Sequence, residues 1–88
     1  MEELMYFVYL LCCADNTLYI GLAKDVERRL AEHQHSSKGA RYTRSRRPVQ
    51  LLAVSEALPD RSSAARLEYA LKRKTRQQKL AWAAQHAL

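Results

Sequence analysis

The fold is decided by residues 6–22, which read Tyr-Phe-Val-Tyr-Leu-Leu-Cys-Cys-Ala-Asp-Asn-Thr-Leu-Tyr-Ile-Gly-Leu. The segment 6–13 is aromatic and apolar and has the length of a strand. Asp15 and Asn16 then favour a turn, because both residue types tolerate left-handed backbone. The segment 17–22 is again strand-like and ends near a glycine. The stretch therefore predicts a β-hairpin.

The length of the hairpin loop decides how Tyr9 and Tyr19 are related. A two-residue loop at 15–16 places the two tyrosines on opposite faces of the hairpin. A three-residue loop at 14–16, with its last residue left-handed, pairs Tyr19 with Leu11 and Tyr9 with Gly21. Each tyrosine alone is typical of strand packing. A shared tyrosine site requires the longer loop, in which Gly21 leaves room for the Tyr9 ring or for a ligand.

The remaining elements are a helix from Val26 to about Gln34, a loop over 36–48, a strand over 49–57, a helix over 62–74 and a helix that ends near His86. Asp25 and Asp60 are suitable N-caps for the first two helices, and Thr75 with Gln78 fits a capping box for the third. We expect the last helix to bury Leu80 and Ala84, with Trp82 as a further candidate. The order ββαβαα predicts an α/β (α+β) fold, a small three-stranded antiparallel sheet flanked by helices.

The chain has 88 residues, a length that allows one domain, and we expect residues 1–88 to form it. Its formal charge is +6, and the charge is uneven. Residues 1–37 carry three basic and six acidic side chains, whereas residues 38–88 carry twelve basic and three acidic ones. A basic half of this size indicates a polyanion or an anionic surface as partner.

Cysteine usage and the N-terminus predict a cytoplasmic protein. Cys12 and Cys13 are adjacent in a strand and point to opposite faces, so they are expected to be two free thiols. The N-terminal Met-Glu-Glu does not resemble the basic leader of a signal peptide. The apolar run over 4–13 is about half of the ~20 residues that a membrane helix needs, so no membrane association is expected.

Arg29 and His33 are four residues apart and would share one face of the first helix. An arginine can bind a phosphate through two hydrogen bonds, and a nearby histidine can move a proton. An exposed helix face with an incidental histidine remains the alternative. Arg28 and Glu32 would form an ordinary surface pair.

Glu68 is the sole acidic residue between Arg61 and Leu88. It could form a simple helical ion pair with Lys72, worth about 0.3–0.5 kcal/mol. It could instead be a carboxylate ligand for Mg²⁺, with the surrounding basic residues receiving the phosphates of a substrate.

The segment 38–47 holds five basic residues, one tyrosine and no acid. It is either a solvated loop without a partner or a segment that contacts phosphates and stacks on bases. The candidate nucleic-acid-binding residues are Lys38, Arg41, Tyr42, Arg44, Arg46 and Arg47, together with Lys72.

In sequence order, these features resemble the GIY-YIG nuclease domain. Phe-Val-Tyr at 7–9 and Tyr-Ile-Gly at 19–21 resemble the two motifs that lie on adjacent strands of that family. The segment 21–33 resembles the family's first helix with its arginine and histidine, and Glu68 matches its later helical glutamate. The similarity covers about residues 5–79, and the run 38–48 resembles the loop of small stand-alone bacterial members. Phe7 replaces the first glycine, and no asparagine follows Asn16.

The resemblance implies a three-stranded antiparallel sheet with helices and a nuclease that cleaves DNA with one divalent cation, Mg²⁺ or Mn²⁺. By that resemblance, Tyr9 would be the general base or would orient the attacking water, and Tyr19 would form hydrogen bonds within the site. His33 would assist proton transfer, Arg29 would stabilise charge on the phosphate, and Glu68 would hold the metal.

Three functions follow from these expectations. The first is a metal-dependent nuclease acting on DNA, including structured or damaged DNA as in repair. The second is a DNA- or RNA-binding module on the same scaffold that does not cleave. The third is a subunit of a repair complex whose basic loop contacts a protein partner. The sequence does not specify an oligomeric state.

Overall fold

The hairpin forms with the three-residue loop. The computed structural model describes residues 5–88, in which β1 (Phe7–Cys12) pairs antiparallel with β2 (Leu18–Ala23). Asn16 has a φ of 68°, the left-handed value that the longer loop requires. Tyr9 pairs with Gly21 and Leu11 pairs with Tyr19, so the alternative with a two-residue loop is excluded.

The sheet has three antiparallel strands, as predicted, and the structure arranges them in the order β2-β1-β3. The central strand, β1, is covered on both faces, and Val8, Leu10 and Leu11 are fully buried. The third strand, β3 (Gln50–Val54), is shorter than the predicted 49–57. It ends early because the Ser55 hydroxyl oxygen accepts the Val8 N–H at 3.0 Å, where a backbone carbonyl would accept it in a continuing strand. An isolated bridge then joins Tyr6 to Leu58.

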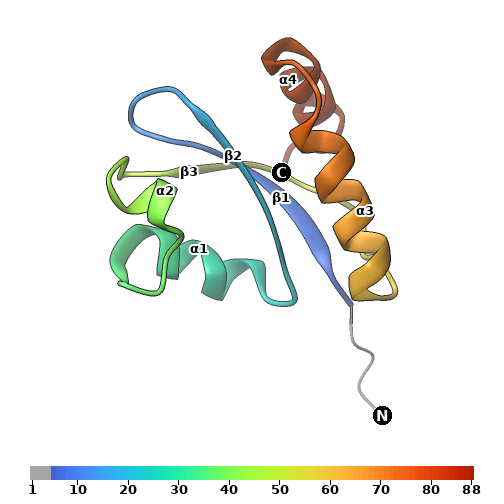
Figure 1. Ribbon diagram of the computed structural model, residues 1–88, viewed down its shortest axis with the longest axis horizontal. Helices are drawn as coiled ribbons and strands as arrows, with labels where there is room; N and C mark the ends of the chain where they lie inside the picture. The colour runs from blue at the N-terminus through green and yellow to red at the C-terminus, as the bar shows by residue number, and fades with distance from the viewer. Residues whose placement is uncertain (1–4) are drawn as a thin grey trace.

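Two pairs of helices enclose the sheet (Figure 1). The first pair, on one side, is α1 (Val26–His35) and α2 (Arg41–Arg44). The second pair, on the other side, is α3 (Arg61–Lys72) and α4 (Arg76–Gln85). The expected caps are present, since Asp25 and Asp60 accept backbone N–H groups and Thr75 forms a capping box with Gln78. Each cap is worth about 1 kcal/mol.

Alternation along the strands produces two apolar layers. Val8, Leu10 and Ile20 point toward α3 and α4 and pack with Leu71. Tyr9 and Leu11 point the other way, where partly buried side chains from α1 cover them. The layer beneath α1 therefore contains both an ordinary core residue and the first candidate catalytic tyrosine.

Two local predictions were wrong. The predicted loop over 36–48 contains α2, which forms because the Ala40 carbonyl accepts the N–H groups of Thr43 and Arg44. In α4, Ala83 is buried, whereas Leu80 is 39% exposed and Ala84 is exposed.

The chain beyond α4 explains the orientation of that helix. The His86 carbonyl accepts the Val54 N–H at 3.3 Å, so the C-terminal segment lies beside β3. This pairing orients α4 with Ala83 toward the sheet. Trp82, the further candidate, is partly buried against the same layer. Within residues 5–88, no helix has both the length and the apolarity to cross a bilayer.

Candidate active site

Tyr9 lies across the one position of β2 that lacks a side chain. Its side chain is almost fully buried, and its cross-strand partner is Gly21. A Cβ at Gly21 would lie 2.6 Å from Tyr9 Cζ and closer still to the phenol oxygen. The glycine therefore creates the space that the Tyr9 hydroxyl occupies.

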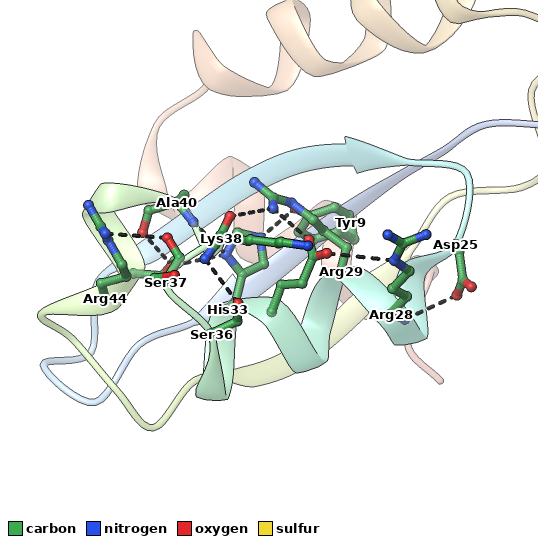
Figure 2. A network of polar contacts seen from close by, with 12 residues as sticks. Tyr9, Asp25, Arg28, Arg29, His33, Ser36, Ser37, Lys38, Ala40 and Arg44 are labelled. Carbon is green, nitrogen blue, oxygen red and sulfur yellow. Dashed lines mark hydrogen bonds and ion pairs between the residues drawn. The ribbon is translucent and has the colours of Figure 1, made fainter.

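His33 comes from α1 and meets Tyr9 beneath that helix. Its ring is fully buried, and its Nε2 lies 2.7 Å from the phenol oxygen of Tyr9 (Figure 2). The Tyr19 ring meets the same imidazole edge-on, with centroids 5.3 Å apart. The structure thus brings together three of the four predicted catalytic residues. His33 is therefore not the incidental histidine on an exposed helix face that the sequence left open as an alternative.

The second nitrogen of His33 is also in contact. Nδ1 lies 2.9 Å from the Thr43 hydroxyl and 3.2 Å from the Ala40 backbone nitrogen. Burial, together with the positive charge of Arg29, lowers the pKa of His33 to about 4. The imidazole is therefore neutral throughout the physiological range.

The depressed pKa of His33 predicts a loss of stability in mild acid. His33 is protonated near pH 6.5 in the unfolded chain but only near pH 4 in the folded chain. The stability that the neutral, buried imidazole contributes is therefore fully present above pH 6.5 and is lost as the pH falls from 6.5 through 4. At about 1.4 kcal/mol per pKa unit, the loss is on the order of 3 kcal/mol. Urea unfolding at pH 7, 5 and 4 measures it.

The matched variant for this prediction is His33→Asn, which removes the titrating group. Asp15, Glu32 and Asp60 also have lowered pKa values and weaken the fold in acid in both proteins. The difference between wild type and variant therefore isolates His33. Parallel stability curves between pH 4 and 6.5 would show that His33 does not carry this dependence.

Arg29, the fourth predicted catalytic residue, is anchored beside Tyr9. Its Nη1 donates to Glu32 at 2.8 Å and to the Lys38 carbonyl at 2.9 Å (Figure 2). The hydrogen bond from Arg29 holds the pKa of Glu32 below its usual value. Arg28 also reaches Glu32, at 3.6 Å, so the predicted surface pair is part of a shared cluster.

Opposing effects act on the phenol of Tyr9. Burial, with a contribution from Tyr19, raises the pKa of Tyr9 to about 12. Arg29 lowers the pKa by charge and hydrogen bonding, and Glu68 has the smallest effect and raises it; the value of about 12 is the balance of all these effects. Arg29 and Glu68 therefore both influence this hydroxyl electrostatically, although they come from helices on opposite sides of the sheet.

Glu68 is partly exposed and has one neighbour of opposite charge. Its side chain is 23% exposed and lies 3.3 Å from the Lys72 ammonium. Among residues 5–88, no cluster of three or more His, Cys, Asp or Glu side chains could enclose a metal. Mg²⁺ is commonly held by one or two carboxylates together with waters and substrate phosphates. Glu68 fits that arrangement and does not fit an all-protein cage.

The predicted nucleic-acid-binding residues divide into two groups. Five are exposed: Lys38, Arg41, Tyr42, Arg44 and Lys72. Arg46 and Arg47 are partly buried. The Arg46 guanidinium lies 3.8 Å over the Tyr42 ring and pairs with Asp15 at 3.0 Å.

Arg47 makes its contacts within the fold. Its guanidinium donates to the carbonyls of Glu32 and His33, at 3.1 and 2.6 Å, and to that of Ser36. These carbonyls lie in the last turn and at the C-cap of α1, where the helix leaves most carbonyls without a partner of its own. Arg47 therefore completes the C-terminus of the helix that carries His33.

This division predicts different effects for two arginine variants. Arg41→Ala is expected to weaken DNA binding and to reduce the slope of log Kobs against log salt by about 1, because one phosphate contact is lost. Arg47→Ala is expected to destabilise the fold by about 2–3 kcal/mol with little change in the slope. Binding titrations at several salt concentrations and urea unfolding measure both. The assignment fails if the two variants exchange these effects.

A cavity of about 200 Å³ opens beside β2, and both pairs of helices contribute residues to its lining. Its lining consists of Leu18, Tyr19, Ile20, Tyr42, Lys72 and Lys79. Tyr19 and Tyr42 stack with centroids 6.0 Å apart, so an aromatic wall faces two lysines. Aromatic surface combined with cations suits a nucleotide, whose base is apolar and whose phosphate is anionic.

Three contributors were not identified as site residues from the sequence: Thr43, Glu32 and Lys79. Thr43 has no periodic or motif signal, since it is a hydroxyl residue inside a basic segment. Glu32 was identified merely as a surface partner of Arg28. Lys79 was visible as part of the basic surroundings of Glu68, but its place in the cavity depends on how α3 and α4 pack.

The chain is similar to known proteins over most of its length. The model of the GIY-YIG catalytic domain matches residues 5–81. The chain is 50% identical over 86 residues to a UPF0213 protein of Streptococcus agalactiae, which covers 98% of this chain and 96% of the relative. It is 55% identical over 67 residues to a UPF0213 protein of Desulfotalea psychrophila, which covers 76% of this chain and 60% of that relative.

Solved structures of similar proteins share the fold of this chain. A protein from E. faecalis, determined by solution NMR, aligns with a TM-score of 0.63 and 38% identity, covering 97% of this chain and 90% of that one. The UPF0213 protein from Bacillus halodurans aligns with a TM-score of 0.57 and 40% identity, covering 91% and 83%.

Proposed function

The chain belongs to the GIY-YIG family of nucleases, and from that premise we propose that it hydrolyses phosphodiester bonds of DNA with one divalent cation, Mg²⁺ or Mn²⁺. The observation that carries the proposal is the 2.7 Å contact between Tyr9 and His33, with Arg29 on the same helix face as His33 and held in place by Glu32 and by the Lys38 carbonyl. A buried hydroxyl beside a histidine and an arginine is suited to activating water for in-line attack on a phosphate.

In this proposal, Tyr9 accepts the proton of the attacking water. A pKa of about 12 keeps the phenol protonated at neutral pH, so it must be converted to a phenolate before it can act as a base. Arg29 favours the phenolate by its charge and also stabilises the negative charge that develops on the phosphate. The Tyr19 ring packs edge-on against His33 and helps to hold the imidazole in place.

Glu68 is the residue that would hold the cation. A divalent ion bound there would supply Lewis-acid stabilisation of the charge on the phosphate oxygens. Lys72, which now pairs with Glu68, would be free to move to a phosphate when DNA binds.

Four exposed cations and the partly buried Lys79 define a path for the DNA backbone. Lys38, Arg41 and Arg44 lie on the α1–α2 side, and Lys72 and Lys79 lie on the α3–α4 side. The cavity between them would receive one nucleotide, with its sugar or base against Tyr42. The proposed phosphate contacts exclude Arg47, because its donors are used on α1.

A binding module without cleavage activity is the second candidate. It is favoured by the burial of Tyr9, which is 2% exposed, and by the raised pKa of that phenol. RNA could then replace DNA as the partner, since contacts to phosphates do not distinguish the two.

A cleavage panel tests the proposal. Purified protein is incubated with labelled single-stranded, duplex, flap and branched DNA in Mg²⁺, Mn²⁺ or EDTA. We expect cleavage with either cation, none with EDTA, and a strongly reduced rate for Arg29→Ala. Binding without cleavage of any substrate would leave the binding module as the function.

A further inference from the structure

The structure assigns a positioning role to Thr43: with the Ala40 N–H, it holds His33 in the tautomer that donates a hydrogen bond to Tyr9. His33 belongs to α1, Ala40 is the N-cap residue of α2 and Thr43 lies within α2. Figure 2 shows His33 between Ala40 and Tyr9. The catalytic consequence rests on the proposed nuclease function. The arrangement of protons rests on hydrogen-bond geometry within the free protein.

The Ala40 N–H determines the protonation of Nδ1. A backbone N–H can only donate, and this one lies 3.2 Å from Nδ1 of His33. Nδ1 must therefore present a lone pair. In a neutral imidazole the other nitrogen then carries the proton, so Nε2–H donates to the Tyr9 oxygen at 2.7 Å.

Thr43 provides a second donor to the same lone pair. Its side chain is fully buried, and its oxygen lies 2.9 Å from Nδ1 and 2.9 Å from the Ala40 carbonyl. The Ala40 carbonyl also lies within reach of that hydroxyl as an acceptor, but it already accepts the N–H groups of Thr43 and Arg44. A hydroxyl proton turned to this carbonyl would leave Nδ1 and the Thr43 oxygen facing each other as two acceptors, or would require a proton on Nδ1 that faces the Ala40 N–H. The consistent solution has Thr43 donating to Nδ1.

Gly39 allows this approach of the two segments. A Cβ at Gly39 would lie 2.5 Å from the Glu32 carbonyl oxygen and 2.9 Å from His33 Cα. Backbone atoms of a helix cannot move aside as a flexible side chain can, so a larger residue would push Ala40 and Thr43 away from the imidazole. The glycine thus acts on His33 through the distance between the loop and α1.

The tautomer restricts what His33 can do. As a donor to Tyr9, His33 cannot take the proton of the Tyr9 hydroxyl. In this arrangement the hydroxyl proton of Tyr9 passes to a solvent water, not to the imidazole, when the phenolate forms. His33 then stabilises the phenolate by its N–H. Thr43 is thus two hydrogen bonds from the reacting oxygen and acts through His33.

The direct test is ¹⁵N NMR of the histidine rings in the free protein at pH 7. We expect His33 to show a proton-bearing Nε2 and a hydrogen-bonded, unprotonated Nδ1. A proton on Nδ1, or on both nitrogens, would overturn the proposal. This measurement requires neither metal nor DNA, so it is decisive even if the protein cuts no substrate.

A pair of variants tests the role of Thr43 itself. Thr43→Val keeps the volume and removes the donor, so the Nδ1 resonance should shift toward that of a nitrogen without this hydrogen bond. The kcat for cleavage should fall about tenfold with KM unchanged. Thr43→Ser should restore both readouts. If the Nδ1 resonance of Thr43→Val stays at the wild-type position, the assignment is overturned. If Thr43→Val does not fold, Thr43→Ser alone gives the test: a Nδ1 resonance away from the wild-type position in that variant overturns the assignment.

Discussion

Replacement of Glu68 by glutamine is expected to reduce metal-dependent cleavage by about 10²–10³-fold while leaving DNA binding intact. Glutamine keeps the shape of the side chain but has no negative charge to hold a divalent cation. A bound cation contributes several kcal/mol to the transition state of phosphate hydrolysis, which corresponds to this factor. Single-turnover cleavage at saturating Mg²⁺, with binding measured in EDTA, separates the two effects.

The stability of the Glu68→Gln variant should be close to that of wild type. The ion pair with Lys72 is lost, but both side chains are partly exposed and such helical pairs contribute about 0.3–0.5 kcal/mol. The net charge rises by one, which favours binding to DNA. A loss of cleavage in this variant therefore cannot be attributed to unfolding or to weaker binding.

Glu56→Gln is the matched control for this experiment. Glu56 is 71% exposed, and its substitution changes the net charge by the same amount. It should cleave at the wild-type rate. If Glu68→Gln and Glu56→Gln cleave equally well, Glu68 is not the metal ligand, although the nuclease function itself would stand.

Gly21→Ala is expected to damage both the fold and the site. The backbone φ of Gly21 is not positive, so alanine is not excluded by backbone conformation. The cost comes from the added methyl group, which would occupy the space of the Tyr9 phenol. Overpacking of this kind costs about 1–3 kcal/mol. A displacement of about 1 Å at a reacting group can reduce the rate about 10²-fold.

Urea unfolding and single-turnover cleavage of Gly21→Ala measure these two losses. The Tyr9 ring is the specific cause, so the alanine should cost less stability when Tyr9 is also replaced by valine. A double-mutant cycle should then give a coupling of about 1 kcal/mol or more. If the cost is the same in both backgrounds, the contact between Gly21 and Tyr9 is not the reason for the glycine.

The sequence predicted much of this fold because its strongest signals are local. The apolar strand segments, the turn residues Asp15 and Asn16 and the helix caps act over a few residues, and they determine β1, β2 and the starts of the long helices. The prediction of α2 failed because that helix is four residues long and depends on the burial of Thr43 against α1. No pattern within 36–48 encodes that contact.

The candidate site also combines features that local sequence predicts with contacts that depend on tertiary packing. Spacing alone placed Arg29 and His33 on one helical face, and the three-residue loop placed Tyr9 and Tyr19 on one face of the sheet. Their meeting depends on α1 packing across that face, which is a long-range event. Arg47 illustrates the limit: as a sequence residue it resembles its exposed neighbours, and its role at the end of α1 depends on chain folding.

By itself, the sequence determined the order ββαβαα, the hairpin register once Asn16 is left-handed, and the separation of an acidic half from a basic half. These properties follow from local backbone preference and from composition. The tertiary structure alone decided that His33 is buried, neutral and placed against Tyr9. Burial and distances between elements set the pKa values, and both arise when the two helical layers pack against the sheet.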